Sequence, residues 1–186
     1  MEDLVHDLDR HIDRLDRARM IRDFLESDAP YNDSMDLYFT LIGEDYQLFP
    51  KTAAFELLKS HGLEILSNES LRFKITDLYQ INIERVYSGG VDQSIHRNIS
   101  RDMEPYLKKY FSLSEKPYLT RVLKENSDSL TFYQFHLKDY NRLKADDGFR
   151  ITLQENLITR ERKIRYHFGL KKQIEEVITA IDEELQ

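Results

Sequence analysis

The chain has 186 residues, of which 40% are hydrophobic and 33% charged, and its net charge is −7 at pH 7. This length is enough for one domain with a hydrophobic core, and the composition is typical of soluble helical proteins rather than disordered chains. The negative charge argues against nonspecific nucleic-acid binding, which needs Lys and Arg to displace counterions. The chain has no cysteine, which excludes disulfides, thiolate metal sites and thiol nucleophiles.

The first predicted element is an amphipathic helix over residues 2–26. Its acids are concentrated at the start and its arginines further along, which suits the helix dipole. Pro30 ends it, since the residue before a proline resists the helical region. A second, short helix is predicted over residues 32–42 and ends at Gly43. The apolar residues of the first helix recur at three- and four-residue spacing and are Leu4, Leu8, Ile12, Leu15, Ala18, Ile21 and Leu25.

The central stretch, residues 49–87, has the clearest start and stop signals. Pro50 suits the first position of a helix, because its missing N–H would be unpaired there anyway. Gly62 ends this helix, since glycine adopts a left-handed backbone without a Cβ penalty. Asn68 or Ser67 then caps the next helix.

Residues 71–87 fit two patterns. Apolar and polar residues alternate over much of the segment, which is typical of a strand. At helical period the apolar residues still fall on one broad face, with Phe73 and Ile81 outside it. No Gly or Pro interrupts the chain between Gly62 and Gly89, and strands usually have only about 5–6 residues. We therefore favour a helix, with a strand as the alternative.

The segment over residues 49–80 reads FPKTAAFELLKSHGLEILSNESLRFKITDLYQ. It combines an aromatic residue and Pro, then Thr, a helix ending in Ser-x-Gly, an apolar link, and Asn-x-x-Leu-Arg opening a helix that ends near a Tyr. This pattern resembles the core signature of an uncharacterised family of small bacterial proteins with a single N-terminal transmembrane anchor and a helical extracytoplasmic domain. The matching residues are Phe49, Pro50, Thr52, Ser60, Gly62, Asn68, Leu71, Arg72 and Tyr79.

The resemblance implies a helix over residues 71–87 and a location on the periplasmic side of a bacterial inner membrane. It implies no activity. The sequence has no signal peptide and no apolar run near the roughly 18 residues that span a bilayer. Membrane association is therefore expected only through an anchor missing from this chain. Without the resemblance, the expected location is the cytoplasm.

Ser88-Gly89-Gly90 is the clearest break in the chain. After it, residues 91–111 resume a helical period, and we expect a kink or a break just before Pro105. Residues 112–117 are predicted to form a loop. A short helix is predicted over residues 118–124.

Residues 130–144 are rich in aromatic side chains. Their start fits a strand, although we favour a helix. Residues 149–186 form a long predicted final helix. With no long linker and no internal repeat, we predict an all-α fold, a single-domain helical bundle of six or seven helices over residues 1–186. The long N- and C-terminal helices, 1–26 and 149–186, pack together as a stalk, and residues 32–145 form the helical core.

The sequence offers little catalytic chemistry. Asp7 and His11 are spaced to share a metal ion, but a zinc site needs further ligands and no second His pair or His-Glu motif supplies them. A polar helix face explains both residues, so we predict no metal. No nucleophile elbow, lactamase motif or phosphate-binding glycine loop is present. We therefore predict no catalytic residues and no cofactor.

One pattern is more specific. Arg160, Lys163, His167 and Lys171 follow helical spacing on the final helix and form a concentrated basic stripe in an acidic protein. One interpretation is a solvated helix face paired with nearby acids, since such exposed pairs are common. The other is a binding site for a phosphate, a carboxylate or an acidic partner.

These patterns predict a non-enzymatic sensing or interaction domain whose partner is a protein or a small anionic ligand, and not a nucleic acid. Two alternatives remain open. One is an enzyme whose acid and base come from distant positions in the sequence. The other is a structural homodimer formed through the terminal helices.

Overall fold

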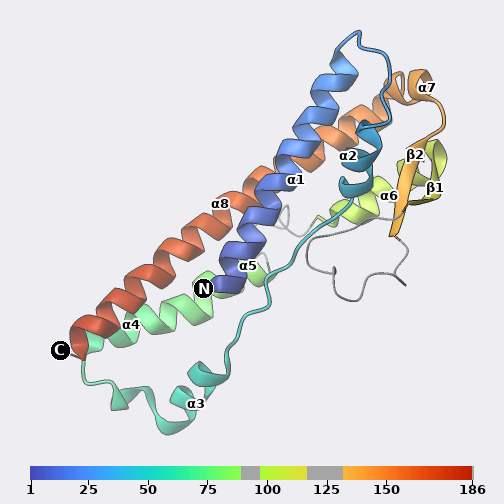
Figure 1. Cartoon of the computed structure of the whole chain (residues 1–186). Helices are drawn as coiled ribbons and strands as arrows, with labels where there is room; N and C mark the ends of the chain where they lie inside the picture. The colour runs from blue at the N-terminus through green and yellow to red at the C-terminus, as the bar shows by residue number, and fades with distance from the viewer. Residues whose placement is uncertain (89–96, 117–131, 186) are drawn as a thin grey trace. The chain divides into compact units, whose positions relative to one another are not determined.

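A computed structural model describes residues 1–88, 97–116 and 132–185 (Figure 1). Two long helices, α1 (Glu2–Glu26) and α8 (Asp147–Glu184), lie at the two ends of the chain and pack together. The other elements are short helices and one small two-stranded sheet. The predicted helical bundle with long, packed terminal helices is therefore confirmed. None of the helices in these described ranges is long and apolar enough to cross a membrane.

The contacts within the chain divide it into two compact units, and each unit contains part of both long helices. Unit 1 comprises Met1–Asp13, Tyr46–Arg97 and Ile158–Gln186. Unit 2 comprises Arg14–Asp45 and Asn98–Leu157. Because α1 and α8 run through both units, the prediction of a single domain stays a prediction.

Helix α1 has the bounds that the sequence predicts. Its apolar stripe is buried as expected, with one exception. Ile12 is only half-buried, and His11 is fully buried in the interval between Leu8 and Leu15. This places an imidazole at a core position of the helix.

Unit 1 contains α3 (Ala53–His61), the short 3₁₀ helix η1 (Leu63–Ile65) and α4 (Glu69–Asp77). Gly62 ends α3 with a φ of 91°, the positive value expected of a glycine at this position. The prediction that Pro50 opens this helix is wrong, since α3 begins three residues later, at Ala53. The chain from Tyr46 to Thr52 has no helical structure.

The helical interpretation of residues 71–87 is confirmed. Helix α4 continues without interruption into the π-helical turn η2 (Leu78–Ile83) and then into α5 (Glu84–Ser88). Asn68 is the cap, and its Oδ1 accepts a hydrogen bond of 3.1 Å from the backbone N–H of Leu71.

The core of unit 1 lies between this segment and parts of α1, α3 and α8. Phe73 and Ile81 lie outside the buried face, as the helical period predicts, with exposed fractions of 58% and 48%. The Phe55 and Tyr79 rings stack with their centroids 4.5 Å apart. The buried residues are Leu4, Leu48, Phe55, Leu71, Ile75, Leu78, Leu170 and Val177.

Unit 2 contains α2 (Met35–Leu41), α6 (Ile99–Tyr110) and α7 (Tyr140–Lys144). Helix α6 continues through Pro105, so of the two expectations the break is wrong and the kink stays a prediction. A proline removes one backbone hydrogen bond. The side chains of Ile99, Met103, Leu107 and Tyr110 are buried along one face of α6, and this packing holds the helix together across the proline.

Unit 2 also contains two antiparallel strands, β1 (Phe111–Lys116) and β2 (Phe132–Leu137), with Phe111 paired to Leu137. They correct the prediction of a loop over residues 112–117. They also correct the helix favoured over residues 130–144, since of its described part, residues 132–144, only α7 is helical.

The edge of β2 that faces away from β1 is covered by α2. The Thr40 hydroxyl accepts a 2.9 Å hydrogen bond from the backbone N–H of Phe135. Side chains distant in sequence thus satisfy the strand edge. The helix predicted over residues 118–124 and the segment 91–96 lie outside the described residues.

Candidate functional site

The residues of the predicted basic stripe divide into an interior part and a surface part. Arg160, Lys163 and His167 are buried, with exposed fractions of 0%, 8% and 4%. Lys171 lies at the surface, where it forms an ion pair with Glu175 one helical turn further along α8. The first three residues therefore do not belong to a solvated helix face. They lie on the buried face of α8, after the buried residue Leu157 and before the buried residue Leu170.

His11 of α1 joins these residues in unit 1. Its ring lies 5.1 Å from the His167 ring and 5.8 Å from the Tyr46 ring, measured between centroids. The Arg10 guanidinium lies 4.8 Å from the centre of the Tyr46 ring, in a cation–π contact. We call His11, Arg160, Lys163 and His167 the basic cluster.

The electrostatic environment of His11 is positive. Burial is the main cause that lowers its pKa to about 3, and the charges of His167, Lys163 and Arg160 lower it further. The backbone of Tyr46 opposes this shift. His11 is therefore neutral at pH 7. Among the described residues, no hydrogen bond of normal geometry reaches either nitrogen of its ring.

The hydrogen bond of His167 indicates its tautomer. Its Nδ1 lies 2.8 Å from the backbone carbonyl oxygen of Lys163. Because a carbonyl only accepts, Nδ1 carries a proton and donates it. This bond fixes the ring on α8, and the cluster presents a fixed arrangement of donors and positive charge. Such an arrangement is suited to a phosphate or carboxylate group.

Sequence reasoning considered His11 only as a metal ligand with Asp7 and assigned it no part in the basic stripe. The spacing alone does not identify His11, because His11 and Ile12 both fit the interval between Leu8 and Leu15, and the apolar residue is the expected one. Across the described ranges, the group of three possible metal ligands lies elsewhere, in unit 2.

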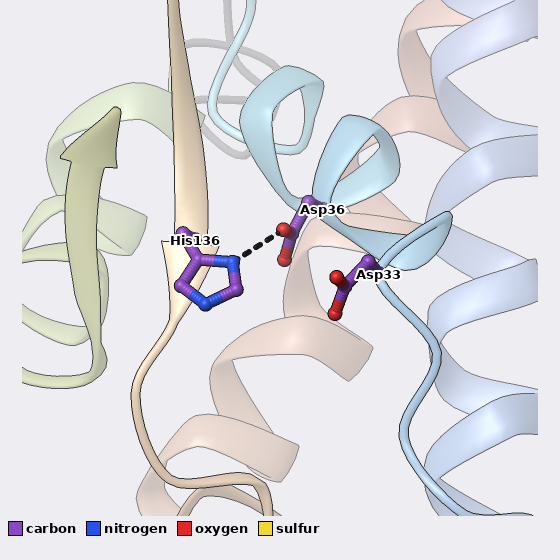
Figure 2. Close-up of side chains that lie close together, drawn as sticks. All are labelled: Asp33, Asp36 and His136. Atoms are coloured by element: carbon purple, nitrogen blue, oxygen red, sulfur yellow. Dashed lines mark hydrogen bonds and ion pairs between the residues drawn. The ribbon is translucent and has the colours of Figure 1, made fainter. Parts of the chain in front are cut away.

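That group consists of Asp33, Asp36 and His136 (Figure 2). Asp36 is fully buried at the start of α2, and its Oδ2 lies 2.8 Å from Nδ1 of His136 on β2. Asp33 lies on the exposed turn that leads into the same helix. The His136 side chain is 46% exposed. A buried carboxylate thus holds an imidazole that solvent reaches. We call these three residues the Asp36 cluster.

The second oxygen of Asp36 is held by two further donors. Its Oδ1 accepts a hydrogen bond from the Tyr31 hydroxyl and one of 3.3 Å from the backbone N–H of Leu137. Burial, followed by the hydrogen bond to Asp36 and its charge, raises the pKa of Tyr31 above its usual range, so this tyrosine stays protonated and donates. The Asp36 carboxylate is therefore fully hydrogen-bonded and fixed in orientation.

Sequence reasoning missed the Asp36 cluster. Asp36 stands among apolar residues at the start of a short helix, and His136 stands a hundred positions later in an aromatic segment. These two residues come together only because β2 packs against α2.

The comparisons with known proteins identify no relative. No protein-family model, no curated protein and no solved structure matches the chain.

Proposed function

We propose that this chain is a non-enzymatic helical module that binds a small anion, or an acidic group of a partner protein, at the basic cluster of unit 1. The observation that supports the proposal is the neutral, buried His11 beside three basic side chains. Positive charge that lowers the pKa of an imidazole also attracts a negative charge. A bound anion would accept charge-assisted hydrogen bonds from these basic side chains.

The cluster combines the donors that oxyanions prefer. Arg160 offers a planar guanidinium for two parallel hydrogen bonds, and Lys163 offers a compact ammonium charge. Both lie on α8, whereas His11 lies on α1. A bound anion would therefore strengthen the packing of these two helices within unit 1. A change in helix packing on binding is the mechanism we propose for sensing, and the two long helices are the elements that would carry it to a partner.

The test is a titration of the full chain with sodium phosphate at low ionic strength, followed by its thermal unfolding temperature. Sodium chloride at matched ionic strength is the control for general screening. A ligand that binds only the folded state raises Tm with concentration, so phosphate is expected to raise Tm more than chloride does.

Variants locate the effect. Lys163→Met removes one buried charge and is expected to abolish most of the phosphate-dependent rise. Lys172→Met is the matched control, because Lys172 lies on the same helix with its side chain 79% exposed. An equal rise in the wild type and in Lys163→Met would overturn the proposal.

The structure also supports one point of the enzymatic alternative. Asp36 and His136 are an acid and a potential base that come together from distant positions, which is the arrangement such an enzyme requires. The test is hydrolysis of simple ester, phosphate and glycoside substrates. Activity that is present in the wild type and lost in His136→Gln would favour this alternative. The periplasmic location and the membrane anchor stay predictions that rest on the family resemblance.

A further inference from the structure

We infer that the Asp36 cluster of unit 2 is a binding site for a divalent transition-metal ion such as Zn²⁺, separate from the basic cluster of unit 1. One ligand atom from each of Asp33, Asp36 and His136 lies within 4.8 Å of the other two. Ligand atoms around one tetrahedral zinc ion lie about 3.3 Å apart, since each lies roughly 2.0–2.2 Å from the metal. A small movement therefore brings all three atoms to bonding distance.

Asp33 has to move furthest to bind the metal, and its position allows this movement. Asp33 is exposed and lies on the turn before α2. The other two ligand atoms, Nδ1 of His136 and Oδ2 of Asp36, are already 2.8 Å apart. Asp33 has to swing its carboxylate toward them, and these two atoms have to separate by about 0.5 Å to reach the spacing around zinc.

The surroundings of Asp36 are those of a metal-binding carboxylate. Ligating carboxylates are oriented by hydrogen bonds from residues around the site. Here the Tyr31 hydroxyl and the Leu137 N–H hold Oδ1 of Asp36, and both bonds can remain when Oδ2 binds a metal. The buried side of the site is thus built, and the exposed side of His136 and Asp33 gives the ion a path of entry.

The donor set selects the class of ion. One imidazole nitrogen with two carboxylate oxygens suits Zn²⁺ and neighbouring transition metals, whereas Mg²⁺ and Ca²⁺ prefer oxygen ligands alone. Three protein ligands also leave a coordination position for water. On binding, the metal takes the place of the proton between Nδ1 of His136 and Oδ2 of Asp36. A neutral imidazole loses its proton from Nδ1 to solvent and takes one up on Nε2, so it changes tautomer, whereas a protonated imidazole keeps the Nε2 proton and releases the Nδ1 proton to solvent.

The experiment is a titration of the full chain with zinc chloride, with calorimetry for affinity and elemental analysis after dialysis for stoichiometry. The wild type is expected to bind one equivalent. Asp33→Asn and His136→Gln are each expected to weaken binding more than about tenfold, the lower end of the loss seen when even an outer-shell partner is removed. Asp33 is exposed, so its variant leaves the fold intact.

The matched controls are Asp9→Asn and His6→Gln, which change an exposed aspartate and an exposed histidine on α1. Both are expected to bind zinc as the wild type does. Cobalt(II) provides a second readout, because its visible absorption reports an imidazole ligand, and His136→Gln is expected to alter that spectrum. The inference is overturned if the wild type binds less than one equivalent, or if Asp33→Asn and His136→Gln bind zinc as tightly as the controls.

Discussion

The two units bury polar side chains under opposite conditions. In unit 2, the buried carboxylate of Asp36 has hydrogen-bond donors on both of its oxygens. In unit 1, burial lowers the pKa of the His11 ring and nearby positive charges lower it further, so the ring is neutral. A fully satisfied network stabilises the fold and fixes its geometry, whereas a buried imidazole without a hydrogen bond of normal geometry, such as that of His11 among the described residues, lowers stability. Local departures from stable packing are expected where a protein binds something.

The two histidines make the comparison specific. His11 is completely buried, and His136 has nearly half of its side chain exposed and donates to Asp36. Changes at Asp36 and His136 are therefore expected to lower the free energy of unfolding, and removal of the His11 imidazole is expected to raise it.

The largest expected effect is that of Asp36→Ala. This change leaves the donors of Tyr31, His136 and Leu137 without their acceptor, and we expect the free energy of unfolding to fall by about 3 kcal/mol. Urea denaturation followed by circular dichroism measures it. Asp33→Ala is the control, since Asp33 is exposed, and its effect is expected to stay within about 0.5 kcal/mol. Equal effects of the two substitutions would contradict the buried network.

The second effect is a loss of stability in acid that depends on His11. The unfolded chain gains a proton on this residue below about pH 6.5, and the folded chain gains it only near pH 3. Acidification from pH 7 to pH 5 is therefore expected to remove about 2 kcal/mol of stability through this group. The measurement is urea denaturation at several pH values, compared with His11→Phe. The variant should lack this share of the pH dependence, and identical profiles would show that His11 titrates normally.

The third prediction is that replacing a histidine by phenylalanine changes the free energy of unfolding in opposite directions at positions 11 and 136. At pH 7, His11→Phe removes a buried imidazole and is expected to raise the free energy of unfolding by about 1 kcal/mol. His136→Phe removes the hydrogen bond to Asp36 and is expected to lower it by about 1 kcal/mol. Thermal and urea unfolding of both variants tests this. A loss of stability in both would remove the contrast between the units.

The smallest effects come from helix caps and serve as a baseline for both units. In unit 1, Asn68 caps α4 through the Leu71 N–H. In unit 2, Asn98 caps α6 through the Arg101 N–H at 2.9 Å. Substitution of either by Ala is expected to lower the free energy of unfolding by about 0.5 kcal/mol, the low end of the range for helix caps. Urea denaturation measures both, and a much larger loss in one unit would indicate that the units do not unfold together.

The helices could be predicted because their signals are local. The three- and four-residue spacing of α1, the glycine at position 62 and the cap at Asn68 all act within one or two turns of chain. The strands β1 and β2 could not be predicted in the same way. Their pairing joins residues 111–116 to residues 132–137, and the edge of β2 is satisfied by Thr40 of α2.

The candidate site was predicted in part. The spacing of Arg160, Lys163 and His167 identified a basic stripe on α8, but it did not reveal that these side chains are buried. Burial depends on which residues of other elements face the stripe, and a helical pattern in one segment contains no information about them. The His11 ring on α1 completes the cluster only when α1 and α8 pack together.

The π-helical turn η2 also determines how residues 78–88 can vary. A π turn holds one residue more than an α turn and so rotates the following residues back by about 100° relative to a regular helix. Ile83 and Val86 then pack against the core that Leu71 and Ile75 begin. Deletion of Gln80 would remove the extra residue and restore regular winding, so both side chains would still face that core. The turn therefore absorbs one residue, whereas a deletion in the regular helix before it would rotate both side chains away from the core by about 100°.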